Sequence, residues 1–173
     1  IFVGHMGVPH NVDAAEYLVN DILPLIRQST PQVHLNLVGA EPAAQVLSLG
    51  SAPGVRVLGH VADLNAALND AAVFVAPLRF AAGVQNKVLE AMAAELPVVT
   101  TSHVNAGLEA KHGKHLIVAD DAALISEAIL ALLRDPQERR RLGRAGRDFV
   151  LQNYRWEDVL NRVNAIEEKI APA

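Results

Sequence analysis

The residues best placed to bind a ligand follow an apolar run and open a stretch of helical periodicity at residues 84–94. Gly83 allows the backbone to approach a ligand closely. Backbone amides at the start of a helix point their hydrogens, and the positive end of the helix dipole, at an anion. The amides of Val84, Gln85 and Asn86 stand at that start. The pattern therefore predicts an anion site, and a diphosphate fits it.

A carboxylate lies on the same predicted helix. Glu90 follows Asn86 and Lys87 by four and three residues, so the three side chains share one face. There the carboxylate of Glu90 could accept hydrogen bonds from ribose hydroxyls. Taken alone, one glycine and one acid are more simply a loop glycine and a solvated carboxylate, so the surrounding sequence must decide.

Short apolar runs alternate with longer helical stretches, which is typical of βαβ units with a parallel sheet. We expect one domain over residues 1–173, with a Rossmann-like doubly wound α/β fold of about six strands flanked by helices, both faces of each strand being buried. The expected strands are residues 1–4, 33–38, 55–58, 73–76, 97–100 and 116–118. The expected helices are residues 12–28, 43–49, 64–69, 84–94, 122–134, 137–149 and 157–170, with start signals at Asp13, Asp63 and Asp121.

Ligands of such sheets bind outside the carboxyl ends of the strands. The loops that matter therefore begin at Gly4, Gly39, Gly59, Pro77 and Thr101.

Composition excludes several classes of partner and site. The net charge is -4 and the Lys and Arg residues are scattered, so the sequence shows no basic cluster of the kind that binds nucleic acid. The chain has no cysteine, its 7 histidines lack metal-ligand spacing, and we expect no metal or cofactor. Gly-x-Gly-x-x-Gly and Walker motifs are missing from the sequence, which argues against NAD and P-loop ATP sites. The run of Arg139, Arg140 and Arg141 is most simply solvated charge, and a domain or membrane contact is the second interpretation.

Residues 87–100, from Lys87 through Glu90 to Thr100, closely resemble the second half of the Glu-x7-Glu signature of GT-B glycosyltransferases of the retaining family 4 type, also called group 1. The resemblance covers essentially the whole chain and implies the C-terminal, nucleotide-sugar-binding half of such an enzyme. It also implies that Glu90 holds the ribose and that the amides from Gly83 to Asn86 face the diphosphate and the donor sugar.

The chain departs from that family in two places. The first signature Glu maps to Ala82, which puts the identity of the sugar in doubt. Many relatives carry an Arg and a Lys after the first strand, where this chain has residues 4–11, including His5, and a neutral imidazole is a poor substitute for a fixed charge. Lys87, and after it Arg79, are therefore the better candidates for pairing with a phosphate.

Other loops resemble the parts of the family that surround the nucleotide. Gly4 and Gly39 end two strands, and Gly39 would approach the nucleotide, although a glycine there is often only a turn. By resemblance, His60 and Val61 would pack the base through backbone groups. An exposed loop histidine is an equally good interpretation of His60.

The resemblance implies transfer of a sugar from a nucleotide-diphosphate donor, with retention, to a glycan or lipid-linked acceptor held by an N-terminal domain. Bacterial exopolysaccharide or cell-surface glycan synthesis at the cytoplasmic side of the membrane, peripheral to its inner face, is the expected setting. We find no credible catalytic base in this chain and expect the isolated domain to be inactive. A nucleotide-sugar epimerase or phosphorylase of the same fold, and a catalytically inactive binding or scaffold domain, remain the alternatives.

Overall fold

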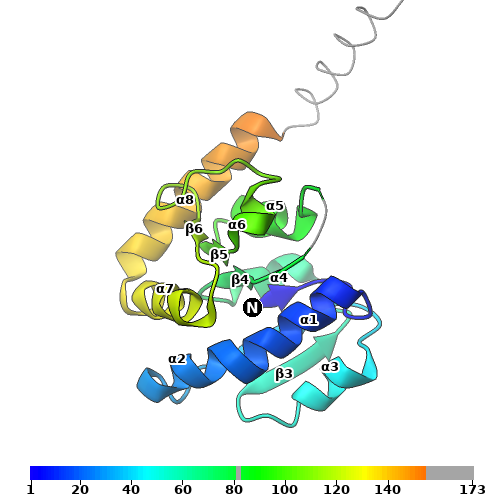
Figure 1. The fold of residues 1–173 in the computed structure, drawn as a ribbon. Coiled ribbons are helices and arrows are strands. Elements are labelled where there is room, and N and C mark those ends of the chain that lie inside the picture. Colours follow the sequence, from blue (N-terminus) through cyan, green and yellow to red (C-terminus); the bar gives the residue numbers. More distant parts are fainter. Residues whose placement is uncertain (81–82, 155–173) are drawn as a thin grey trace, which may run out of the picture.

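The computed structural model describes residues 1–80 and 83–154, in which short parallel strands lie between helices (Figure 1). The hydrogen-bonded strands form two parallel sets, in the orders β1-β2-β3 and β4-β5-β6. The strands are β1 (Phe2–Val3), β2 (Leu35–Val38), β3 (Val55–Gly59), β4 (Phe74–Ala76), β5 (Val98–Thr100) and β6 (Ile117–Val118).

Two backbone hydrogen bonds join β1 to the start of β4. The nitrogen of Ile1 donates to the Val73 carbonyl at 2.9 Å, and the Val75 amide donates to the Ile1 carbonyl at 3.0 Å. The strands therefore follow the spatial order β3-β2-β1-β4-β5-β6, and the order reverses between β1 and β4. This is the doubly wound arrangement, so the predicted fold class is confirmed.

Burial of the strands depends on their place in the sheet. All residues of β4 and β5 are buried, as expected for central strands with helices on both faces. In β3, by contrast, Arg56 and Leu58 are exposed and alternate with the buried Val55 and half-buried Val57. β3 is an edge strand with one face open, so the prediction that both faces of every strand are buried is wrong there.

Helices pack around the sheet in contacting pairs: α1 against α3, α2 against α7, and α5 against α8 (Figure 1). The helices are α1 (Pro9–Tyr17), a π-helical stretch (Leu18–Ile22), α2 (Leu23–Ser29), α3 (Ala44–Leu49), α4 (Leu64–Asn69), α5 (Asn86–Ala93), α6 (Ser102–Asn105), α7 (Ala122–Arg134) and α8 (Pro136–Asn153). Within the described ranges, no helix is both long enough and apolar enough to cross a bilayer.

The first helix begins earlier than the sequence predicted. Pro9 occupies its first turn, where a missing amide hydrogen costs nothing, so Asp13 lies inside the helix and does not start it. Pro24 follows the π-helical stretch, and its lack of a donor accounts for the break in the α-helical pattern. Asp63 and Asp121 do cap helices, because their carboxylates accept hydrogen bonds from backbone amides of α4 and α7.

The helix expected at residues 84–94 begins later than predicted. Its N-cap, Gln85, has an extended backbone (φ -91, ψ 98), and α5 starts at Asn86. The helix α6 was not predicted, because four residues are too few to show a helical period. The last expected helix, at residues 157–170, lies outside the described residues.

Close packing against α8 fixes the position of α5. A Cβ added at Gly143 would lie 1.9 Å from the Glu95 carbonyl oxygen, just beyond the end of α5. Arg147 donates to the Ala93 carbonyl at 3.1 Å and so caps that end. Arg139 donates to the Leu132 and Leu133 carbonyls of α7, so part of the arginine run caps helices.

Candidate functional site

The candidate site lies where the strand order reverses. There the loop after β1, from Gly4 to Val8, leads to α1, and the segment after β4, described at residues 77–80 and 83–85, leads to α5. Doubly wound folds bind their ligands in this crevice. The side chain of Lys87, in the first turn of α5, reaches α1 and hydrogen bonds to Asn11.

Lys87 carries a partly buried positive charge. Its ammonium donates to the Asn11 side-chain oxygen and lies 5.3 Å from the centre of the Phe2 ring. Burial lowers the pKa of Lys87 from 10.5 to about 8, because the charged form loses hydration. None of the ion pairs within the described residues includes Lys87. Among the described residues, this ammonium has a hydrogen-bonding and an aromatic partner but no carboxylate paired with it.

Asn11 is a site residue that sequence reasoning missed. Its side chain is buried, and its amide group donates to the His5 carbonyl at 2.9 Å. A Cβ at Gly4 would lie 2.8 Å from the Asn11 side-chain carbon, so the glycine leaves room for this residue. The one signal in the sequence was a polar residue at the start of a helix, which by itself is most simply a surface position.

The predicted approach of Gly39 to a ligand has a simpler explanation in the structure. Gly39 has a φ of +149°, and a Cβ there would lie 1.6 Å from the Gly4 carbonyl oxygen. The ends of β1 and β2 therefore pack backbone against backbone at this point. This contact alone requires a glycine at position 39.

The loop before α5 is exposed at Gly83 and Val84, whereas Gln85 is buried. Val88 donates the first hydrogen bond of the helix, to the Gln85 carbonyl at 2.9 Å. The amides that precede it in the first turn are those of Asn86 and Lys87. The sequence had placed them at Val84, Gln85 and Asn86, so the predicted donor set shifts along the chain. Ala82, at the first signature position, lies outside the described residues.

A second glycine supports this loop from behind. Gly107, just after α6, packs so closely that a Cβ there would lie 2.8 Å from the Gly83 carbonyl oxygen. Thr101 caps α6 and donates to the Leu78 carbonyl at 2.7 Å. Sequence reasoning missed Gly107 and named Thr101 only as the start of a loop, because each acts through a contact between distant segments.

Arg79 already has a carboxylate partner. Its guanidinium donates two hydrogen bonds to Asp13 on α1, one of them at 3.0 Å, and lies 4.8 Å from the centre of the Tyr17 ring. The hydrogen bond with Asp13 raises the pKa of Arg79. In this arrangement Asp13 engages two of the five N–H donors of Arg79 and pairs with its charge, so Arg79 is a weaker candidate for a phosphate than Lys87.

The other predicted residues lie on α5 and in the loops that follow the carboxyl ends of β1 and β3. Glu90 is exposed on α5, one turn beyond Lys87. His5 lies 3.4 Å from the Glu41 carboxylate, in the next loop. His60 is exposed and Val61 is half-buried after β3, two strands away from β1. The structure thus brings Gly4 and Lys87 together around Asn11 and leaves His60 and Val61 apart from them.

The described part of the chain contains no group of three or more His, Asp and Glu side chains that could hold a metal ion.

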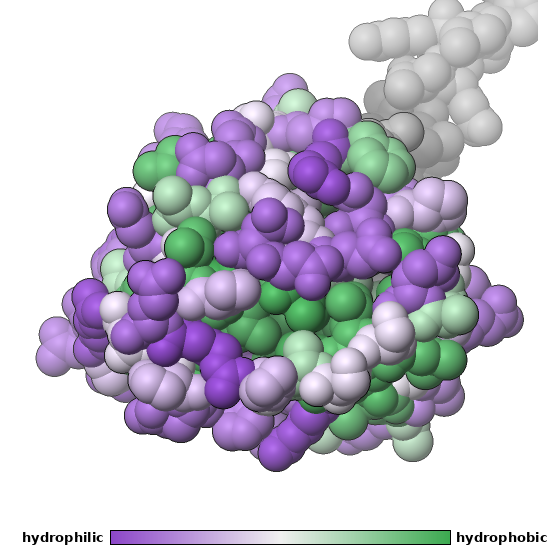
Figure 2. Space-filling model, turned by 60° about the horizontal axis from the view of Figure 1, so that its bottom comes forward, coloured by the Kyte–Doolittle hydropathy of each residue, from purple (hydrophilic) through white to green (hydrophobic). Residues whose placement is uncertain are grey.

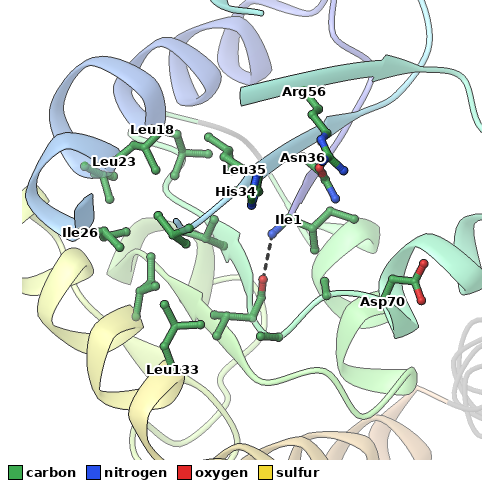
Figure 3. A pocket seen from close by; sticks show the side chains of 17 residues that line it. Ile1, Leu18, Leu23, Ile26, His34, Leu35, Asn36, Arg56, Asp70 and Leu133 are labelled. Atoms are coloured by element: carbon green, nitrogen blue, oxygen red, sulfur yellow. Dashed lines mark hydrogen bonds between the residues drawn. The ribbon is translucent and has the colours of Figure 1, made fainter. Parts of the chain in front are cut away.

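A cavity of about 420 Å³ lies away from this site, at the opposite ends of the strands. Figure 3 shows Ile1, Leu18, Leu23, Ile26, Leu35 and Leu133 around it. The Asn36 side-chain oxygen is buried there without a hydrogen-bond partner among the described residues. On the face seen in Figure 2, apolar residues gather in a recessed area ringed by polar ones. Because ligands of this fold bind at the carboxyl ends of strands, we do not place the candidate site in this cavity.

Comparison with known proteins adds the family to this geometry. The family model described as glycosyl transferases group 1 matches residues 1–135. The chain is 32% identical over 157 residues to a phosphatidyl-myo-inositol mannosyltransferase of Mycobacterium leprae, covering 87% of this chain and 42% of that protein. It is 23% identical to an uncharacterized 44.6 kDa protein in the cps region of Klebsiella pneumoniae, covering 94% of this chain and 44% of that protein.

The fold is also that of a solved structure, HepE of Anabaena in complex with UDP, with a TM-score of 0.79. The identity is 17%, and the match covers 97% of this chain and 48% of that one. The chain thus spans slightly less than half the length of each of these three proteins. With the family model matching most of its length, the chain belongs to the group 1 glycosyl transferases.

Proposed function

We propose that this chain is the donor-binding, C-terminal half of a glycosyltransferase and binds the diphosphate of a nucleotide sugar in the crevice between β1 and β4. The observation that carries the proposal is the Lys87 ammonium, which is partly buried there with neutral partners. Burying a charge without a counter-charge is unfavourable, and an anionic ligand would relieve that cost. A nucleoside diphosphate is an anion of the right kind, and the family supports this choice.

The first turn of α5 adds to the attraction. The amides of Asn86 and Lys87 stand at the positive end of the helix dipole, in the turn that carries the Lys87 side chain. Glu90, one turn further on, is exposed and free of the ion pairs found in the described residues, so its carboxylate can accept ribose hydroxyls. Diphosphate and ribose would thus be held by one helix.

The same groups would assist the reaction. When the bond between sugar and diphosphate breaks, negative charge develops on the departing diphosphate. A fixed ammonium and helix amides stabilise that charge more than they stabilise the ground state, which lowers the barrier. A second domain would hold the acceptor and complete the cleft, and the resemblance to the retaining family supports retention at the anomeric carbon.

The setting we propose is the synthesis of a bacterial exopolysaccharide or cell-surface glycan at the cytoplasmic side of the membrane. The relative from a cps region and the relative named for a phosphatidyl-inositol acceptor support this setting. An inactive nucleotide-sugar-binding domain is the second candidate, favoured by Ala82 at the first signature position.

Calorimetric titration with UDP, GDP and ADP tests donor binding. We expect saturable binding of one of them, weakened about 10-fold or more by Glu90→Ala, since a hydrogen bond to a charged group contributes about 1.5–3 kcal/mol. Glu127→Ala, on the exposed face of α7, is the matched control and should bind as the wild type does. A folded wild-type chain that binds none of the three at millimolar concentration would refute the proposal. Sugar transfer by the full-length protein separates the active enzyme from the inactive domain.

A further inference from the structure

Asn11 connects the loop after β1 to α5, through a hydrogen bond with Lys87, which lies 76 residues further along the sequence. Its amide group donates to the His5 carbonyl in the loop after β1, and its oxygen accepts a hydrogen from the Lys87 ammonium on α5. Asn11 is 3% exposed, and both the nitrogen and the oxygen of its buried side chain have hydrogen-bond partners. Asn11 therefore fixes Lys87 against the end of β1.

The chemical nature of Asn11 matters as much as its position. A carboxamide oxygen accepts a hydrogen bond from an ammonium without neutralising its charge. An aspartate at this position would place a full negative charge beside Lys87 and satisfy the ammonium before any ligand arrives. The neutral amide holds the cation in place and leaves its charge available.

We propose that Asn11 is a positioning residue for the donor, holding the Lys87 ammonium at the crevice while leaving its charge uncompensated for the diphosphate. This inference rests on the proposed function and adds a residue to it. Gly4 is part of the arrangement, because a Cβ there would collide with the Asn11 side chain.

The charged and titratable neighbours of Lys87 agree with this arrangement. On α1, the pKa of His10 is lowered by burial and then by the charge of Lys87, so both groups lie in one electrostatic environment. Asp13, two residues beyond Asn11, is held by Arg79 and so is already paired. On α5 itself, Glu90 is exposed. Phe2 of β1 presents a neutral ring.

Asn11→Asp is the decisive variant, because it keeps the shape and the acceptor and adds only the charge. Titration with UDP, GDP and ADP should show at least a 10-fold loss of affinity for the nucleotide that the wild type binds. The pH at which that affinity declines should move upward, because the new carboxylate raises the pKa of Lys87. Asn69→Asp, an exposed position at the end of α4, adds the same charge elsewhere and should bind normally.

Asn11→Ala guards against misfolding of the charged variant. It removes the tether without adding charge, and we expect a loss of affinity of about 3-fold or more in a chain whose circular dichroism is unchanged. Weakened binding in Lys87→Met together with wild-type affinity in Asn11→Asp and Asn11→Ala would overturn this inference alone. Failure of the wild-type chain to bind any of the three nucleotides would overturn the proposed function, and the inference with it.

Discussion

The Asp13 carboxylate accepts two hydrogen bonds from the Arg79 guanidinium, which also lies over the Tyr17 ring. This contact ties α1 to the segment that follows β4. It also uses one of the donor pairs of the planar guanidinium that make an arginine suited to phosphate. The two cations near the crevice therefore differ, since one is paired with a carboxylate and the other is not.

Arg79→Met tests this difference. Because the Arg79 side chain is about half exposed, loss of the pair should lower the free energy of unfolding by only about 0.2–1 kcal/mol, as measured by urea denaturation. Nucleotide affinity should change by less than about 3-fold, which is less than 1 kcal/mol. A 10-fold loss of affinity in calorimetry would show instead that Arg79 contributes to binding of the ligand.

The lowered pKa of Lys87 predicts opposite effects of pH on binding and on stability. Its pKa is about 8 in the folded chain against 10.5 for an ordinary lysine, so between these values the unfolded chain binds more protons. The free energy of unfolding of the wild type, measured relative to that of Lys87→Met, should therefore rise between pH 8 and 10.5. It rises because the buried lysine loses its charge in the folded chain. Affinity for a diphosphate should fall over the same range, because the ammonium is lost.

Chemical denaturation and calorimetry at pH 7, 8, 9 and 10, on the wild type and Lys87→Met, measure both trends. Tyr17 and the other groups that titrate in this range are present in both chains, so the difference isolates Lys87. An affinity that stays constant to pH 10 would contradict the assignment of Lys87 to the diphosphate.

Gly107→Ala tests the support behind the loop before α5. The added methyl would meet the Gly83 carbonyl oxygen at 2.8 Å and push the loop outward. We expect the free energy of unfolding to fall by about 1–3 kcal/mol and the nucleotide affinity to fall with it. Gly50→Ala, which meets the Leu47 carbonyl far from the crevice, should affect stability alone. Equal affinities in the two variants would remove Gly107 from this role.

Gly143→Ala tests the packing of α8 on α5. With a Cβ at 1.9 Å from the Glu95 carbonyl oxygen, the helices must separate, and we expect a loss of about 1–3 kcal/mol or more in urea denaturation. Arg144→Ala, at the adjacent exposed position, should change stability by less than about 0.5 kcal/mol. A Gly143→Ala variant as stable as the wild type would show that α8 shifts at no cost.

The sequence predicted the elements of this fold well because their signals are local. Strands such as Val98–Thr100 read as apolar runs, and α7 was predicted with its observed bounds because Asp121 caps a strongly periodic segment. The start of α5 was misplaced by two residues because Gln85 has an extended backbone, which no residue type at that position announces. Exposure of Arg56 on β3 depends on strand order, which periodicity does not contain.

The candidate site was predictable only in part, for the same physical reason. Lys87 could be singled out because it stands in the first turn of a helix that follows a loop glycine. Asn11 could not, because its role depends on a contact with a residue 76 positions away. The pairing of Arg79 with Asp13 was hidden in the same way, and it explains why Arg79 ranks below Lys87 as a phosphate ligand.

Binding of the diphosphate by Lys87 is tested by measuring the affinities of a nucleoside diphosphate and of its nucleoside. Both are titrated into the wild type and into Lys87→Met, with Lys114→Met as a control at an exposed position. We predict that Lys87→Met lowers the calorimetric affinity for the diphosphate by about 10-fold or more. We also predict that the weak affinity for the nucleoside, which lacks phosphate, stays unchanged in Lys87→Met. Lys114→Met should bind both ligands with the affinity of the wild type. An unchanged affinity of Lys87→Met for the diphosphate, in a folded chain, would contradict this role of Lys87.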